Sequence, residues 1–252
     1  MALARTLSFA VLLSAALAPS ANALFLLKQE RAPGGQLEQT WSPGFGVGRV
    51  FTPLTLASED AAVPNPSGDN TVAVLTNNAT QLGGIALAAM EPLGHADYTW
   101  SGWFFTGAGD TRRGLVLRAD PANEFQTFYQ LVVNAGLFQL RFRKFVAGAP
   151  LPDLGSWFLN TLPGGVPTAN SWHHLQVSAA GNSFRCFFDG IEMTTAPIVD
   201  ATDPILRGWV GAYNFSASVG EVPVYFDDLK LEADTPSPTV RASWGALKQR
   251  FR

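Results

Sequence analysis

The chain alternates short apolar segments with turn-forming residues over most of its length, and this rhythm is its most constraining feature. The segments are rich in aromatic and β-branched residues, and most of them end at Gly, Pro, Asn or Asp. They are residues 70–76, 84–90, 97–105, 114–120, 125–134, 137–146, 172–178, 183–188, 208–215 and 222–231. No window before residue 235 sustains the 3.6-residue apolar repeat of a helix. The sequence therefore predicts an all-β fold, an antiparallel β-sandwich or jelly roll.

Composition excludes two broad classes of protein. Only 15% of the residues are charged, against about 25% in typical soluble domains. The chain also holds 18 Phe and 7 Trp, so most of it is not intrinsically disordered. The calculated pI near 5.6 argues against a strongly basic nucleic-acid-binding protein.

Residues 1–23 have the layout of a secretory signal peptide. Arg5 precedes the apolar run 7–18, and Ala21-Asn22-Ala23 is a small-residue cleavage site. A single-span anchor is the alternative, but the run is shorter than the roughly 20 residues that cross a bilayer. No later segment is apolar for long enough to span a membrane. We expect a secreted, extracytoplasmic domain over residues 24–234.

Residues 235–252 form a separate C-terminal segment, a short Pro-containing linker followed by a basic tail. Trp244, Leu247 and Phe251 fall on one face of a helix, and the segment holds four basic and no acidic residues. The tail is expected either to dock on the sandwich or to contact an anionic surface or the export machinery.

Alternation within the predicted strands assigns side chains to faces. In 137–146, Phe138, Leu140 and Phe142 are expected on one face and Gln139, Arg141 and Arg143 on the other. In 172–178, Trp172 and His174 lie opposite Leu175 and Val177. The Gly- and Pro-rich run 147–170 is expected to be a long loop, which in compact domains often carries function.

One block of the second half resembles a known family. It joins Trp172-His173-His174-Leu175-Gln176-Val177 to Phe184–Phe188 and Asp189-Gly190, and the later strand Phe226–Leu231 has the form of the family's closing strand. Residues 36–233 thus resemble the laminin-G-like, concanavalin A-like lectin/glucanase superfamily, and loosely 3-keto-disaccharide hydrolase-type domains. The resemblance implies a concanavalin A-like jelly roll, a fold that hosts many functions.

Sugar binding requires aromatic platforms beside hydrogen-bonding groups. The candidates for one non-core face are Trp103, Arg118, Gln130, Gln139, Arg141, Trp172 and His174. The alternative is that Trp172 fills a gap at a strand end and that the arginines are solvated charges.

The resemblance also implies a structural calcium ion, for which Asp227 and Asp228 are the candidate ligands because calcium prefers oxygen donors. No other cofactor is expected. Solvated or turn-capping aspartates are the alternative. Cys186, the only cysteine, alternates with Phe184 and Phe188 and is interpreted as a buried hydrophobe.

Catalysis by the glucanases of this superfamily needs paired carboxylates on one strand face, in an E-x-D-x-x-E arrangement. The chain has no such run, and its glutamates stand apart. The favoured interpretation is therefore a non-catalytic module that binds glycan or another extracellular ligand. A hydrolase of the 3-keto-disaccharide type and a structural or adhesion protein of the cell envelope are the alternatives.

Overall fold

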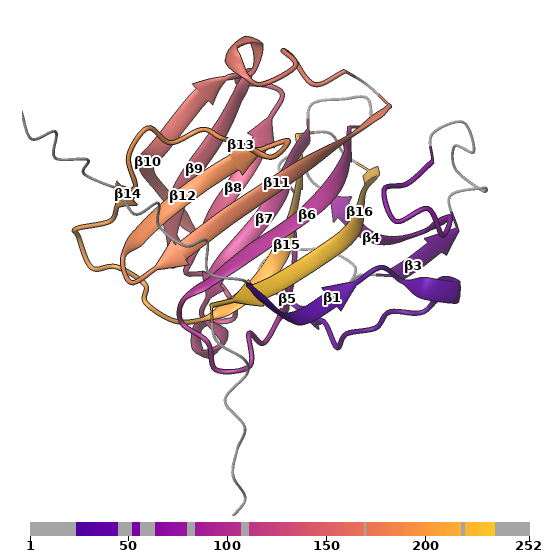
Figure 1. Ribbon diagram of the computed structural model, residues 1–252, viewed down its shortest axis with the longest axis horizontal. Helices are drawn as coiled ribbons and strands as arrows, with labels where there is room; N and C mark the ends of the chain where they lie inside the picture. Colours follow the sequence, from indigo (N-terminus) through magenta and orange to yellow (C-terminus); the bar gives the residue numbers. More distant parts are fainter. Residues whose placement is uncertain are drawn as a thin grey trace, which may run out of the picture.

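The computed structural model describes residues 24–44, 52–55, 64–79, 84–106, 111–168, 170–217 and 220–234. They form two antiparallel sheets that face each other (Figure 1). The predicted signal peptide, residues 1–23, and the C-terminal tail, residues 235–252, lie outside the described residues.

The front layer in Figure 1 is a nine-stranded sheet. Its strands are β1 (Phe25–Glu30), β3 (Thr52–Thr55), β4 (Thr71–Ala79), β6 (Tyr98–Thr106), β11 (Ser171–Ala180), β12 (Ser183–Phe188), β13 (Ile191–Glu192), β14 (Ile198–Val199) and β16 (Gly220–Ala233). They lie in the order β13-β12-β11-β6-β16-β4-β3, with β1 beside β16 and β14 beside β12.

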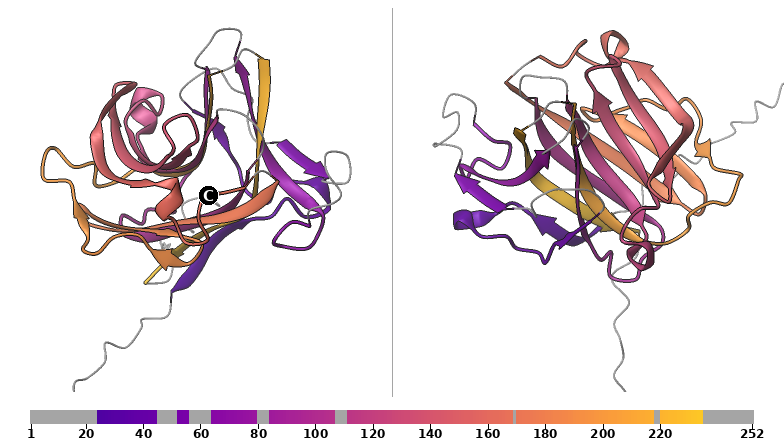
Figure 2. Two further views of the ribbon diagram at one scale, coloured as in Figure 1. Left: turned by 90° about the horizontal axis from the view of Figure 1, so that it is seen from above. Right: turned by 180° about the vertical axis from the view of Figure 1, so that it is seen from behind.

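The second layer is a seven-stranded sheet, which Figure 2 shows facing the first. Its strands are β2 (Ser42–Pro43), β5 (Gly84–Met90), β7 (Thr111–Ala119), β8 (Phe128–Asn134), β9 (Gln139–Val146), β10 (Ala149–Phe158) and β15 (Trp209–Ser216). Their order is β10-β9-β8-β7-β15-β5-β2. Short 3-10 helices lie between strands at η1 (Pro33–Gly35), η3 (Pro121–Asn123) and η4 (Leu159–Thr161). Among the described residues, no helix is long and apolar enough to cross a membrane.

The core lies between the sheets and takes alternate residues from the strands of both. Leu175 and Val177 of β11 and Leu140 and Phe142 of β9 are fully buried there. Cys186 lies in the same cluster, as the alternation predicts, and burial raises the pKa of its thiol. Side chains between these positions point to the two outer faces, where any ligand surface of a sandwich must lie.

The all-β antiparallel sandwich is confirmed, and each of the ten predicted segments overlaps a strand. The prediction of one long loop over 147–170 is wrong in its first half, because residues 149–158 form β10. Pro150 and Pro152 made this segment resemble a loop. A strand with prolines is tolerated at a sheet edge, where N–H groups are not all needed, and β10 is that edge. Its pairing with β9 is irregular between Pro150 and Gly155.

The predicted inward position of Phe138 is also wrong. It was expected on the core face with Leu140, but it has a left-handed φ of 56° in the turn before β9, and its side chain is exposed. The strand alternation begins only at Gln139.

Gly114 allows β7 and β8 to approach closely. A Cβ atom there would lie 2.0 Å from the Leu131 carbonyl oxygen and 2.8 Å from the Val132 Cα, which are backbone atoms that cannot rotate away. We expect Gly114→Ala to lower the free energy of unfolding in urea by about 3 kcal/mol, the upper end for overpacking. Gly155→Ala is the control, because its Cβ would meet the flexible ends of Ile198 and Trp157. Equal effects of the two variants would contradict the steric argument.

Candidate functional site

The structure divides the predicted ligand residues between opposite sides of the sandwich. Trp103, Trp172 and His174 lie on the outer face of the nine-stranded sheet, because the core-facing residues of β6 and β11 are their sequence neighbours. Gln130, Gln139 and Arg141 lie on the outer face of the seven-stranded sheet for the same reason. The expectation of a single shared face is therefore wrong.

Arg118 belongs to neither face, which corrects its assignment as a ligand residue. It has a left-handed φ of 53° and lies where the pairing of β7 with β15 skips a residue, so a bulge interrupts the alternation. The side chain is fully buried. Its guanidinium donates hydrogen bonds to the backbone oxygens of Gly181, Ile205 (2.8 Å) and Ala96 (3.1 Å). Arg118 thus joins three loops at one end of the sandwich.

Trp103, Trp172 and His174 come together at a cavity of about 490 Å³ on the outer face of the nine-stranded sheet. β6 supplies Trp103, and β11 supplies the other two. The rest of the lining is Asp189, Gly190, Asp228 and Lys230. The cavity therefore combines two indoles with an imidazole, two carboxylates and an ammonium group.

Aromatic contacts hold these rings in place. The Trp103 and His174 ring centroids are 5.1 Å apart, and Trp172 meets Phe105 edge-on at 5.2 Å. Trp103 and His174 are direct cross-strand partners in the β6–β11 pairing. The buried Nε1–H of Trp172 has no hydrogen-bond partner among the described residues. Buried indole N–H groups usually find an acceptor, so this donor is available to a ligand oxygen.

The charges around the cavity are largely compensated. Lys230 Nζ lies 2.6 Å from Asp228 Oδ2. Burial lowers the pKa of His174, an effect that the nearby Asp189 carboxylate opposes and Lys230 reinforces. His174 is therefore a neutral imidazole at neutral pH, able both to donate and to accept a hydrogen bond.

The opposite face carries the second group of predicted residues. Asp153 of β10 accepts hydrogen bonds from Arg141 (2.7 Å) and Arg143 (2.9 Å), which ties the edge strand to β9. The buried Oε1 of Gln130 and Nδ2 of Asn134, both on β8, have no hydrogen-bond partner among the described residues. The same face carries a second apolar cluster, in which Phe128 stacks on Phe145 with ring centroids 4.7 Å apart and Tyr213 is buried.

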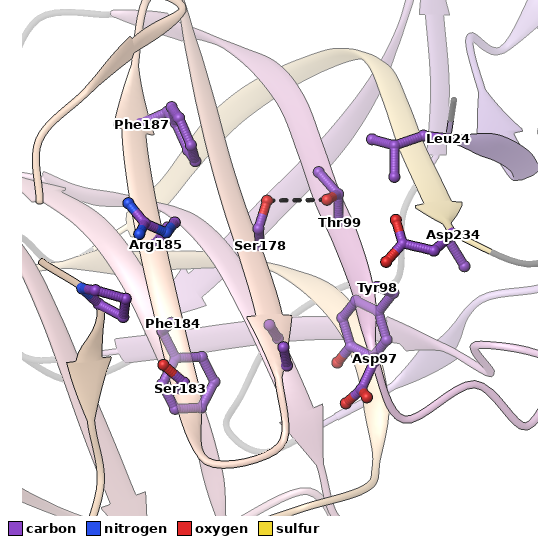
Figure 3. Close-up of a pocket in the computed structure, with 14 residues that line it drawn as sticks. Leu24, Asp97, Tyr98, Thr99, Ser178, Ser183, Phe184, Arg185, Phe187 and Asp234 are labelled. Carbon is purple, nitrogen blue, oxygen red and sulfur yellow. Dashed lines mark hydrogen bonds between the residues drawn. The ribbon is translucent and has the colours of Figure 1, made fainter. Parts of the chain in front are cut away.

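A larger cavity of about 880 Å³ lies at the ends of β6, β11 and β12 (Figure 3). Ser178 and Thr99 are joined there by a 2.9 Å hydrogen bond, and Leu24 and Asp234, at the two ends of the described chain, border it. None of the predicted ligand residues lines it. It lacks indoles, and Arg185 on its wall is paired with Glu192.

The two predicted calcium ligands have different surroundings. Asp228 contacts Lys230 and lies 3.4 Å from Arg31 Nε, so two cations already neutralise it. Asp227 is buried and turns toward the loop that precedes β4. A bulge in β16, with a left-handed φ of 48° at Asp228, sends the adjacent carboxylates in different directions. Of these two aspartates, only Asp227 is therefore a candidate metal ligand.

Asp227 belongs to an oxygen cluster around Asn65. Within 3.1 Å of Asn65 Nδ2 lie Ser67 Oγ, Asp69 Oδ1, the Thr71 carbonyl oxygen and Asp227 Oδ2. A side-chain amide has only two N–H donors, so it cannot satisfy four acceptors. Hard cations such as calcium take six to eight oxygens of these kinds. No group of three or more His, Cys, Asp or Glu side chains suited to a metal occurs in the described part of the chain. A calcium ion would therefore depend on the Ser67 hydroxyl and the Thr71 carbonyl beside two carboxylates, since the Asn65 oxygen accepts from the Asn70 N–H.

The two carboxylates of the cluster titrate differently. Burial raises the pKa of Asp227 to about 6; hydrogen bonds from Ser67 and Asp228 oppose this, and the Asp69 charge adds to it. Burial also raises the pKa of Asp69, but hydrogen bonds from Thr71, Asn65 and Ser67 outweigh it and leave that pKa lowered.

The chain belongs to the concanavalin A-like lectin/glucanases superfamily, because the profile of its Laminin_G_3 family matches residues 78–233. No curated protein sequence matches the chain significantly.

The chain is also similar to solved structures. The carbohydrate binding module CBM66 from Bacillus subtilis superposes with a TM-score of 0.51 at 16% identity, over 77% of this chain and 96% of the module. Domain 4 of AbnA, an extracellular arabinanase from Geobacillus stearothermophilus, was solved with arabinotriose. It gives a TM-score of 0.46 at 13% identity, over 83% of this chain and 92% of that domain.

Sequence reasoning missed several residues of these sites. Asp189 and Lys230 were not singled out, although Asp189-Gly190 is a visible turn signal. Asn65, Ser67 and Asp69 were not singled out either, because Asn65 and Ser67 meet Asp227 across a separation of about 160 residues.

The raised pKa of Asp227 predicts a pH dependence of stability in the metal-free protein. The folded value of about 6 exceeds the ordinary 3.8, so the folded state holds this proton more tightly than the unfolded state. Its stabilising contribution is present below pH 3.8 and is lost as the pH rises through 6. With chelator present, the free energy of unfolding of the wild type should fall relative to Asp227→Asn by up to about 3 kcal/mol between pH 4 and 7. Parallel pH curves in urea titrations would contradict the burial argument.

Proposed function

We propose that the protein is a carbohydrate-binding module whose ligand lies over Trp103 and Trp172 on the outer face of the nine-stranded sheet. The observation that carries the proposal is the cavity in which two indoles meet a neutral imidazole and an unpartnered Trp172 Nε1–H. Sugar rings offer C–H faces that pack on indoles, and hydroxyl groups that accept and donate hydrogen bonds at their rim.

The size and charge of the cavity agree with a small uncharged sugar unit. Its volume of about 490 Å³ falls within the roughly 300–1,000 Å³ of small-molecule sites. Lys230 is neutralised by Asp228, so little net charge faces the ligand. The name of the B. subtilis module of similar fold, a carbohydrate binding module, supports the same class of ligand.

Export and the absence of glycoside hydrolysis complete the proposal. The signal-peptide pattern of residues 1–23 supports a secreted protein. Asp189 and Asp228, the carboxylates at the cavity, are engaged by His173 and Lys230 respectively, which supports binding rather than glycoside hydrolysis. We also propose that the basic tail, residues 235–252, contacts an anionic surface or the export machinery.

The binding face can be tested by substitutions on opposite sides of the sandwich. Trp172→Ala and Trp103→Ala should each weaken binding to a glycan identified on an array by at least about 10-fold, since each removes a stacking surface. Arg141→Ala, on the opposite face, is the matched control and should leave the Kd unchanged. Isothermal titration calorimetry gives the Kd values, and thermal melts confirm folding.

The remaining outcomes separate the alternatives. If only Arg141→Ala lost glycan binding, the binding site would lie on the outer face of the seven-stranded sheet. Release of reducing sugar would support the hydrolase, and absence of binding to any glycan would favour a structural or adhesion role. Each result would overturn the proposed site or function.

We propose in addition that the oxygen cluster at Asp227 holds a structural calcium ion. Asp227, Asp69, Ser67 and the Thr71 carbonyl would hold it. The Asn65 amide N–H groups, which face these oxygens and cannot satisfy all four, would turn aside. The ion would stabilise the loop against β16 and take no part in chemistry.

Calcium should raise the melting temperature of the wild type at pH 7 after removal of metal. A calcium concentration of about 100 Kd corresponds to about 2.7 kcal/mol of stabilisation. Asp227→Asn should lose this response, whereas Asp228→Asn, on the cation-paired carboxylate, should keep it. An equal response in all three proteins, or none in the wild type, would reject the calcium site.

A further inference from the structure

A second cluster of reactive side chains lies where β11 begins. Ser171 Oγ is 2.9 Å from His173 Nε2, and His173 Nδ1 is 2.8 Å from Asp189 Oδ2. These three side chains form a continuous Ser–His–Asp hydrogen-bonded chain. The sequence patterns did not reveal it, because the aspartate comes from the turn after β12.

The fold places each member of this chain. Ser171 and His173 share one face of β11, two residues apart, next to the core residue Leu175. The pairing of β11 with β12 brings the Asp189-Gly190 turn beside them, and Asp189 has the left-handed φ of 49° that this turn requires.

Contacts with the backbone and the core fix the histidine and the aspartate. Asp189 Oδ1 accepts a hydrogen bond from His174 N at 2.7 Å, and the Asp189 N–H donates to the His174 carbonyl oxygen at 2.9 Å. The His173 ring stacks on Phe188, with centroids 5.2 Å apart. The side chains of His173 and Asp189 are 16% and 29% exposed, so the pair is shielded from solvent yet reachable at the rim of the sandwich.

The hydrogen-bond partners indicate where His173 and Ser171 carry their protons. An ionised carboxylate only accepts, so His173 carries a proton on Nδ1, which faces Asp189. With its single proton there, the ring directs the lone pair of Nε2 at Ser171 Oγ. This is the tautomer that a general base needs to take a hydroxyl proton. The Ser171 hydroxyl donates its proton to the Thr168 carbonyl oxygen at 2.6 Å. Because a hydroxyl group has one proton, it must turn from Thr168 to His173 Nε2 before His173 can take it.

From this geometry we infer that Ser171, His173 and Asp189 form an acyl-transfer centre that hydrolyses short-chain O-acyl esters. Ser171 Oγ bonds to the acyl carbon while its proton passes to His173 Nε2. The ester C–O bond then breaks, and the departing alcohol takes that proton. Water attacks the acyl-serine, gives a proton to His173, and releases the carboxylic acid as Ser171 regains its proton. The net reaction is ester plus water to acid plus alcohol.

Asp189 is a positioning residue in this scheme. It holds the His173 tautomer and does not touch the ester. It also borders the proposed glycan cavity, but the activity inferred at Ser171 does not require glycan binding.

The test uses the full chain with p-nitrophenyl acetate and a fluorophosphonate probe. Mass spectrometry should find the probe on Ser171. Ser171→Ala and His173→Gln should lower the hydrolysis rate by at least about 100-fold, because general-base catalysis contributes about 10²–10⁴-fold. Ser178→Ala is the control on the same strand, since Ser178 bonds Thr99 and contacts no histidine in the described structure. It should keep both labelling and rate.

Asp189→Asn should lower kcat with KM unchanged, because it disturbs the tautomer and not the ester contacts. Thermal melts of each variant separate this effect from unfolding. Trp172→Ala should keep the hydrolysis rate, and Ser171→Ala should keep glycan binding, so failure of one function is distinguishable from failure of the other.

Three results would overturn the inference. The first is no labelling of Ser171. The second is a Ser171→Ala rate equal to that of the wild type while His173→Gln is inactive, which would make the imidazole itself the nucleophile. The third is a lower melting temperature in Ser171→Ala without loss of the hydrolysis rate. The hydrogen bonds among Ser171, His173 and Asp189 would then serve only to stabilise the fold.

Discussion

Burial of alternate residues from both sheets in one apolar core is the constraint on which the rest of the structure depends. Each strand must present its apolar set inward, so its register is fixed and every second side chain is sent to an outer face. Trp172 and His174 are outward on β11 because Leu175 and Val177 are inward. The candidate ligand cavity is thus a consequence of core packing on the other side of the same strand.

Two of the bulges in the described strands redirect charged side chains. At Arg118 the bulge directs the guanidinium group toward one end of the sandwich, where it donates hydrogen bonds to the backbone oxygens of three loops. At Asp227 and Asp228 the bulge in β16 separates adjacent carboxylates, one into an oxygen cluster and one toward Lys230 and Arg31. In both places an extra residue in one strand lets a charged side chain leave the plain outer face.

The start of β11 is the point where the proposed functions meet. Trp172 and His174 face the cavity, whereas Ser171 and His173 face the opposite side of the strand. Asp189 contacts both sets, since one carboxylate oxygen accepts from the His174 backbone and the other pairs with the His173 ring. A single hairpin thereby supports an aromatic binding surface and a Ser–His–Asp chain within a few residues.

The alternation of apolar segments with turn residues was enough to predict the all-β sandwich, ten of its strands and the outward positions of Trp172, His174 and Arg141. These follow from strand periodicity, which a sequence displays directly. It was not enough to predict β10, because prolines in an edge strand look like a loop until its partner β9 is known. The division of ligand residues between two faces, the burial of Arg118, the cluster at Asp227 and the approach of Asp189 to His173 were decided by tertiary structure. Each depends on strand order, on a bulge or on contacts between distant segments, and none of these leaves a periodic signal along the chain.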